Sequence, residues 1–199
     1  PQGNFASPVF HDERPDPMPH YEMTGNPVSI AFSEQSPPVK MRSFKLYQDT
    51  KEIRDVKILD KDNDPNRLLT ERQFALFPLQ PLEYDTDYRA VFEYRQNGKD
   101  RTAEWTFSTQ KPDYPYFIVK GGETLAIESG QKYFIHWQDF WCLKQCERYN
   151  YRTNRDTQID IIERQAGGII IRVNGSKGSS IRLMPEGEDR RAITLYLWK

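Results

Sequence analysis

The feature that most constrains this chain is a series of short runs in which apolar and polar residues alternate. In the run 27–32, Val28, Ile30 and Phe32 share one face. Alternation with a period of two is typical of strands that bury one face. Further strands are expected at 43–48, 55–59, 73–79, 87–96, 101–109, 116–120, 124–128, 132–138, 157–164, 169–175, 179–185 and 191–198. No long helical period is present, so we expect an all-β protein.

Turn signals divide these strands into two groups. Asn97-Gly98 lies between two alternating runs, which is a strong hairpin signal. Seven or so short strands at intervals of 8–12 residues favour a β-sandwich, and "QKPDYP" has the composition of a linker. We therefore expect an extended, proline-rich lead-in at 1–23, a β-sandwich at 24–110, a linker at 111–115 and a smaller β-sandwich or barrel at 116–199.

The charge and hydropathy of the chain argue against two classes of partner. Its 28 basic and 29 acidic residues give a net charge of -1, so we expect no nucleic-acid binding. No apolar run approaches the ~20 residues of a membrane span, and the mean hydropathy is -0.83. The chain starts at Pro1 without an initiator Met, and we interpret this as a processed or trimmed N-terminus.

The segment "DKDNDPNRLLTE" at 60–71 has the ligand spacing of an EF-hand calcium loop. An EF-hand requires Gly at the sixth place and a helix on either side. Pro65 occupies the sixth place and cannot adopt a positive φ, while both flanking runs have the period of strands. We therefore expect a solvated connection between two strands rather than a calcium site.

Residues 8–110 carry several motifs of one known group. "NPVSIAFSE", "PLEYDTDYRAVFEY" and the closing "WTFST" resemble bacterial Ig-like domains. "DERPDPMPHYEMTGNPVSIAF" at 12–32 and "DPNRLLTERQFALFPLQPLEYDTDYRAVFEY" at 64–94 are similar to the Ig-like domain that follows the CAP domain in many secreted bacterial proteins. CAP denotes the cysteine-rich secretory, antigen 5 and pathogenesis-related superfamily.

This resemblance implies an Ig-like β-sandwich in an extracytoplasmic bacterial protein, secreted or periplasmic, with an accessory or binding role after a CAP domain. The His and Glu cleft residues of the CAP domain have no counterpart in this sequence. No CAP function is therefore assigned to any position. The second half of the chain resembles no family that we identify.

The segment 136–152, "HWQDFWCLKQCERYNYR", carries most of the reactive side chains. His136, Asp139, Cys142 and Cys146 are a conceivable metal set, but zinc sites usually pair two Cys or His motifs and the second is missing. A local Cys142–Cys146 disulfide is the prediction for an exported protein, with free thiols or a metal site as alternatives. A Cys nucleophile with His136 as its base is a further alternative.

The same segment interleaves aromatic rings with cations, a pattern suited to capturing sugars or anionic groups. The alternative is that the rings cover one end of the second domain while the charges stay in water. The candidate ligand-binding residues are Trp137, Phe140, Trp141, Tyr149, Tyr151, Arg148 and Arg152.

No complete catalytic signature is present, neither G-x-S-x-G nor HExxH nor a Rossmann glycine pattern. We therefore predict a non-enzymatic binding or accessory module, without cofactor or metal, whose partner is an unidentified protein or glycan. The alternative functions are a carbohydrate-binding module and a thiol- or metal-dependent hydrolase that uses the 136–152 loop. Trp137, Trp141 and Tyr149 lying coplanar on the surface would support carbohydrate binding.

Overall fold

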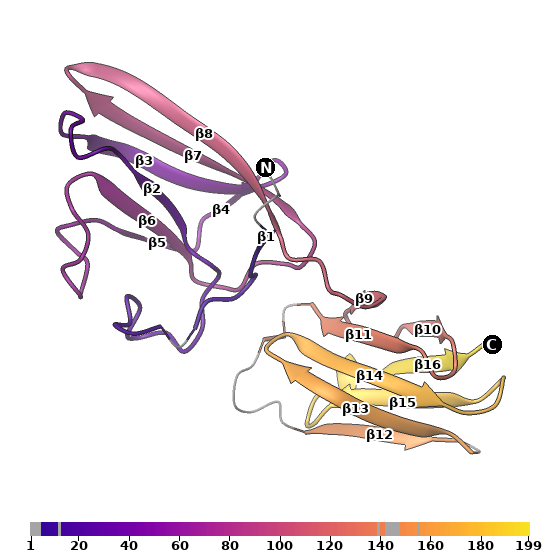
Figure 1. Ribbon diagram of the computed structural model, residues 1–199. Coiled ribbons are helices and arrows are strands. Elements are labelled where there is room, and N and C mark those ends of the chain that lie inside the picture. Colours follow the sequence, from indigo (N-terminus) through magenta and orange to yellow (C-terminus); the bar gives the residue numbers. More distant parts are fainter. Residues whose placement is uncertain (1–4, 12, 139, 142–147, 155) are drawn as a thin grey trace. The chain divides into compact units, whose positions relative to one another are not determined.

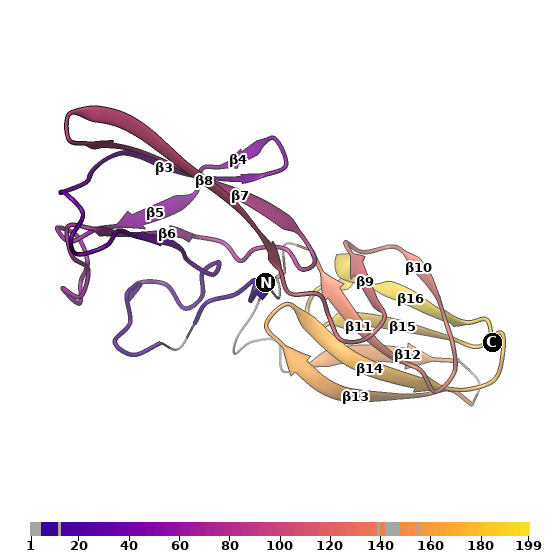
Figure 2. The ribbon, with the colours of Figure 1, turned by 45° about the horizontal axis from the view of Figure 1, so that its top comes forward.

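A computed structural model describes residues 5–11, 13–138, 140–141, 148–154 and 156–199. The chain forms two compact units, Pro1–Lys111 (unit 1) and Pro112–Lys199 (unit 2). Each unit consists of two layers of strands (Figures 1 and 2). The all-β expectation is confirmed, since the one helical element described is a 3-10 turn, Asp189–Arg191. No helix in the described residues is long and apolar enough to span a membrane.

Unit 1 is a sandwich of a five-stranded and a three-stranded sheet. The first sheet has the order β1 (Phe5–Ala6), β8 (Lys99–Thr109), β7 (Asp87–Gln96), β3 (Lys40–Gln48) and β4 (Lys51–Ile53), and the second has the order β2 (Val28–Ala31), β6 (Gln73–Pro78) and β5 (Val56–Leu59). If β2 to β8 are matched in chain order to strands B to G of the immunoglobulin fold, these sheets correspond to B-E-D and to C′-C-F-G. The Ig-like expectation for this half is confirmed.

Alternation along β7 builds the core of unit 1. Tyr88, Ala90, Phe92 and Tyr94 are buried, and the ring of Phe92 meets Phe44 edge-on with 5.2 Å between ring centroids. The hairpin to β8 turns through Asn97 and Gly98, both with positive φ (52° and 74°), as a type I′ turn requires. The lead-in also contributes to unit 1, because β1 pairs with β8 and Met18 is only 1% exposed.

A tyrosine fixes the entry into β7. The hydroxyl of Tyr88 accepts a hydrogen bond from the backbone N–H of Glu83 at 2.9 Å. This is the tyrosine corner, which immunoglobulin-type sandwiches place between strands E and F. The motif "PLEYDTDY" therefore has a structural explanation: it positions a ring in the core whose oxygen ties down the preceding turn.

Unit 2 is also a sandwich, of two four-stranded sheets. One has the order β13 (Gln158–Gln165), β14 (Gly168–Asn174), β11 (Lys132–Trp137) and β9 (Tyr116–Val119). The other has the order β10 (Thr124–Ile127), β16 (Ile193–Leu197), β15 (Ser180–Pro185) and β12 (Tyr149–Thr153). Ile135, Ile171, Leu183 and Leu195, from both sheets, are fully buried in the shared core. Tyr133 repeats the corner of unit 1, because its hydroxyl accepts the N–H of Glu128 at 2.9 Å.

Candidate functional site

Part of the 136–152 segment lies outside the described residues. Asp139, Cys142 and Cys146 belong to that part, so the disulfide, free-thiol and metal interpretations stay as predictions. Within the described part of the chain, no group of three or more His, Cys, Asp or Glu side chains is placed to hold a metal ion.

Two of the seven candidate binding residues belong to the core. Trp137 is 0% exposed, and its indole N–H donates to the carbonyl of Arg191 at 2.8 Å. Tyr149 is 8% exposed and packs on Trp137 with ring centroids 5.6 Å apart. Trp137, Trp141 and Tyr149 therefore do not form the coplanar exposed surface that would have supported carbohydrate binding by these three rings. The rings of Trp137 and Tyr149 face inward because both residues occupy the core-facing positions of their strands.

Phe140 and Trp141 are partly buried and pack against unit 2. Arg191 lies over the Phe140 ring, 5.0 Å from its centroid, and donates to the carbonyl of Gln138 at 3.0 Å. Trp141 covers His136 with 4.8 Å between ring centroids. Gly167 makes this possible, since a Cβ there would lie 2.6 Å from the Trp141 ring. These contacts anchor Phe140 and Trp141 on unit 2.

His136 is a buried side chain rather than an exposed ligand. It is 0% exposed, and its Nδ1 lies 2.8 Å from the carbonyl of Gly167. Because a carbonyl only accepts, Nδ1 carries the proton in this contact. Burial beneath Trp141 and this hydrogen bond give His136 a packing role.

Arg148 and Tyr151 lie with Tyr149 at the open side of unit 2, where β12 and β13 are the edge strands of the two sheets. A concavity of about 400 Å³ opens there, which we call the edge concavity. It is lined by Arg148, Tyr149, Asn150, Tyr151, Ile159, Ile161, Arg164 and Glu186. Three of the seven sequence candidates, Arg148, Tyr149 and Tyr151, are thus brought together. Arg152 is exposed but is not part of the lining.

A β-bulge places a second cation in the edge concavity. The register of β13 against β14 shifts between Ile161 and Glu163. The extra residue puts Arg164 opposite the buried Ile169, in the inward-facing row that Ile159 and Ile161 begin. Sequence reasoning missed Arg164, Ile159 and Ile161. The break in alternation in "IDIIER" was the signal that could have indicated the bulge.

The electrostatics of the edge concavity combine buried and exposed groups. Burial raises the pKa of the Tyr149 hydroxyl to about 12, although the positive charge of Arg164 acts in the opposite direction. Tyr149 is therefore a neutral hydroxyl at pH 7. The lining comprises two tyrosines, two arginines, two isoleucines, one asparagine and one glutamate. It therefore combines cationic, hydroxyl-bearing and apolar side chains.

The acidic segment 60–71 connects β5 and β6, as expected. The carboxylates of Asp60 and Asp64 accept hydrogen bonds from the segment's own backbone. The carboxylate of Asp64 accepts N–H groups of Asn66, Leu68 and Leu69 at 3.0, 2.7 and 2.9 Å. Burial by itself would raise the pKa of Asp64, but these hydrogen bonds outweigh it and the pKa lies below its usual value. The segment is a turn built on carboxylate–backbone bonds.

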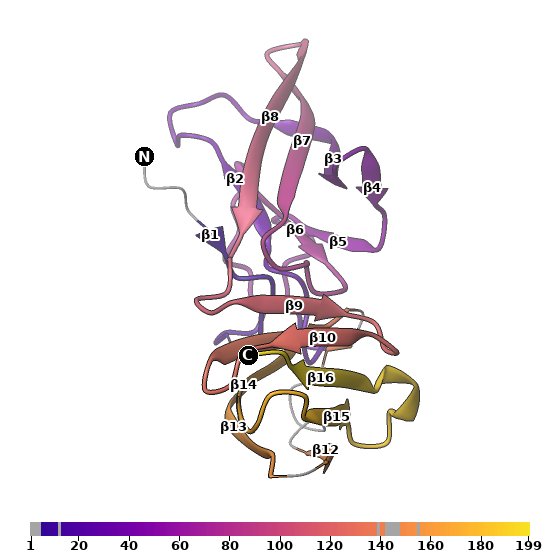
Figure 3. The ribbon, with the colours of Figure 1, turned by 90° about the vertical axis from the view of Figure 1, so that its right-hand side faces the viewer.

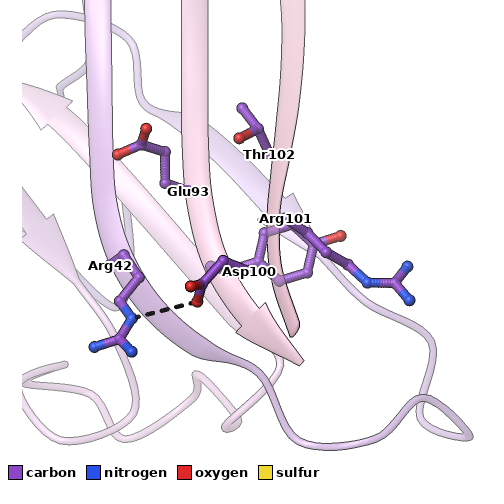
Figure 4. Close-up of a pocket in the computed structure, with 6 residues that line it drawn as sticks. Arg42, Glu93, Asp100, Arg101 and Thr102 are labelled. Carbon is purple, nitrogen blue, oxygen red and sulfur yellow. Dashed lines mark ion pairs between the residues drawn. The ribbon is translucent and has the colours of Figure 1, made fainter. Parts of the chain in front are cut away.

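Another concavity, of about 460 Å³, lies in unit 1 on the β7–β8 hairpin and β3. Figure 4 shows Arg42 and Asp100 turned toward each other and the Arg101 guanidinium pointing away. The Arg42–Asp100 pair spans 3.9 Å between well exposed side chains, and such surface pairs contribute little. Nothing in the sequence singled out these residues, and we assign them no function.

No family model matches this chain, and no curated protein matches it. Among solved structures, a titin I-band fragment I67–I69 is 10% identical, with 86% of this chain and 59% of that chain covered and a TM-score of 0.27. The chain thus spans about three-fifths of that fragment. Domains 4 and 5 of the S-layer protein SbsC are 13% identical, with coverages of 80% and 100% and a TM-score of 0.27. At these scores the likeness carries no argument, so the Ig-like assignment of unit 1 depends on its strand order and tyrosine corner.

Proposed function

We propose that this chain is a non-catalytic binding or accessory module of an extracytoplasmic bacterial protein, and that it binds its ligand through the edge concavity of unit 2. The observation that carries the proposal is the convergence of Arg148, Tyr149, Tyr151 and Arg164 on one open side of a rigid sandwich. Groups held on rigid β-scaffolds are suited to binding. The finer assignment, an Ig-like domain that accompanies a CAP domain, is supported by the motifs of residues 8–110 and by the Ig-like strand order.

The binding role is tested by retention on solid-phase material. The full chain is passed over immobilised protein and polysaccharide fractions of bacterial envelopes, next to Tyr151→Ala and Arg148→Ala variants. We expect one fraction to retain the chain, with at least tenfold weaker retention for both variants. Lys177→Ala, an exposed residue outside the concavity, is the matched control. Equal retention of all variants, or retention by no fraction, would refute the proposal.

The extracytoplasmic location is tested by the state of the two cysteines. Thiol alkylation of the purified native protein, with and without prior reduction, is read by intact mass. Labels that appear only after reduction indicate a Cys142–Cys146 bridge, formed in an oxidising compartment. Two labels without reduction count against export and favour the thiol and metal alternatives.

A further inference from the structure

The outer face of the sheet β10-β16-β15-β12 carries a second set of groups, apart from the edge concavity. Figure 3 shows these four strands side by side. Alternation defines the face, because Ile181, Leu183, Ile193 and Leu195 are buried and their neighbours point outward. The exposed or half-buried outward residues of the four strands are Thr124, Ala126, Asn150, Arg152, Ser180, Arg182, Thr194 and Tyr196, whereas Met184, at an outward position of β15, is buried. Within the strands this row contains two Arg and neither Asp nor Glu, and Glu128, two residues beyond Ala126, is paired with Lys199.

The two arginines face each other directly. Arg152 on β12 is the cross-strand partner of Arg182 on β15, and both side chains are exposed. Among the described residues, neither guanidinium has an ion pair or a side-chain hydrogen bond. Like charges directly opposite each other in a sheet destabilise it. An anion bound between them would remove this repulsion, since guanidinium groups bind carboxylates, sulfates and phosphates through paired N–H donors.

Two aromatic rings extend the same face. Tyr196 lies opposite Ser180, and Arg182 lies opposite Thr194 on β16. Tyr196 is therefore a diagonal neighbour of Arg182. Trp198 follows two residues later, about 7 Å along the strand direction. The backbone N–H of Trp198 donates to the backbone carbonyl of Ile127, which continues the pairing of β16 with β10. Tyr196 is 40% exposed and Trp198 is 44% exposed.

From this arrangement we propose that the Arg152–Arg182 pair and the Tyr196–Trp198 pair form a binding face for an acidic polysaccharide. The arginines would hold a carboxylate or sulfate group, and the exposed rings would stack on the apolar faces of neighbouring sugars. At the far end of this row Lys199 lies 5.4 Å from the Trp198 ring centroid and is paired with Glu128 at 3.5 Å, so these two residues add no net charge to the face. The proposal uses residues distinct from the edge concavity and does not depend on it.

Charge density favours a glycan over single-stranded nucleic acid. A nucleic acid carries a phosphate at every nucleotide and is usually bound in a continuous basic groove. Here the paired cations occupy one end of the face, and the chain as a whole has a net charge of -1. An acidic glycan whose charges are sparser than those of a nucleic acid, and whose sugars have apolar faces, matches a surface with one cationic and one aromatic region.

The test is affinity electrophoresis of the full chain through gels that contain hyaluronate or κ-carrageenan, which carry a carboxylate or a sulfate on alternate sugars only, or neutral dextran. We expect retardation by at least one acidic glycan and none by dextran; the first two gels distinguish a carboxylate from a sulfate preference. The Arg152→Gln/Arg182→Gln variant and the Tyr196→Ala/Trp198→Ala variant should each weaken retardation at least tenfold. Arg95→Gln/Lys99→Gln in unit 1, which changes the charge equally, should not. Tyr151→Ala, in the edge concavity, should also leave it unchanged.

Stability provides the readout that separates binding from folding. Arg182→Gln should leave the melting temperature unchanged or raise it slightly, because it removes a like-charge contact, while it weakens glycan binding. Absence of retardation by both acidic glycans would overturn the proposal. Equal loss in the unit 1 control would show nonspecific charge attraction and would also overturn it. Equal or stronger retardation by polyglutamate or oligothymidylate would overturn it in favour of a peptide or a nucleic acid.

Discussion

At the scale of single residues, this protein uses side chains to satisfy its own backbone. Asp64 caps three N–H groups of the segment between β5 and β6, and Tyr88 and Tyr133 each accept one N–H at the start of a core strand. Buried N–H groups without partners are costly. The same residue types that suggested a cation site or a family motif therefore stabilise turns.

The Asp64 carboxylate should contribute stability that depends on pH. Its pKa is lower in the folded chain than in the unfolded chain, so the contribution is present above about pH 4, near the unfolded value, and is lost as pH falls through the folded value. Asp64→Asn should lower the free energy of unfolding of unit 1 by about 1–2 kcal/mol at pH 7. Denaturant titrations at pH 7 and pH 3 measure this. A difference between variant and parent that is no smaller at pH 3 would contradict it.

The tyrosine corner should contribute to the stability of unit 1 about as much as one hydrogen bond does. Tyr88→Phe keeps the buried ring and removes the acceptor of the Glu83 N–H, so we expect a loss of about 1 kcal/mol. Urea denaturation gives this value. Tyr21→Phe, at an exposed tyrosine of the same unit, is the control and should change stability much less. An equal effect of both substitutions would argue against the corner.

At the scale of elements, the β7–β8 turn is set by local backbone preference, whereas the edge strand β12 is set by pairing with its neighbour. The β7–β8 hairpin follows from Asn97-Gly98, since only a few residue types tolerate positive φ at both central positions. The edge strand β12 has no such local signal, because "YNYRT" shows a single buried residue. Its pairing with β15 alone makes it a strand.

Substitutions of Gly98 should measure how much the positive φ at this position costs a residue that carries a side chain. Gly98 has φ 74°, and a Cβ added there would meet no atom within 4 Å beyond its chain neighbours, so the cost of a side chain is the backbone strain alone. Gly98→Val should destabilise unit 1 by about 1–2 kcal/mol, whereas Gly98→Asn should cost clearly less, because Asn tolerates this region. Thermal unfolding compares the two variants. Equal destabilisation by both would point to a cause other than φ.

At the scale of the whole molecule, the chain has separate cores in its two units. The core of unit 1 centres on Phe92 and that of unit 2 on Trp137 and Ile135, and the two clusters share no residue. Each cluster joins strands from both layers of its own sandwich. We therefore expect each unit to have its own cooperative unfolding transition.

Phe92→Ala tests this expectation. Removal of a fully buried ring should destabilise unit 1 by about 3–5 kcal/mol. Hydrogen exchange read by mass spectrometry should then show faster exchange in β3 and β7 and unchanged protection in β11 and β14. An equal loss of protection in both units would mean that the chain unfolds as one.

The sequence by itself determined the elements. Alternation is a local property of the chain, so thirteen expected runs became strands, and the Asn97-Gly98 hairpin formed where two positive φ values were needed. The missed strands β1, β4 and β12 are short or lack buried alternation, and pairing with a neighbouring strand creates them.

Only the tertiary structure decided which side chains are available for binding. The aromatic segment looked uniform in sequence, yet Trp137 and Tyr149 are buried while Tyr151 is 50% exposed. Arg164 joined the edge concavity through a bulge, and Arg152 met Arg182 through strand register. Burial and cross-strand contact depend on which strands pair and in what register. Residues far apart in the chain set those pairings, so a local pattern cannot reveal them.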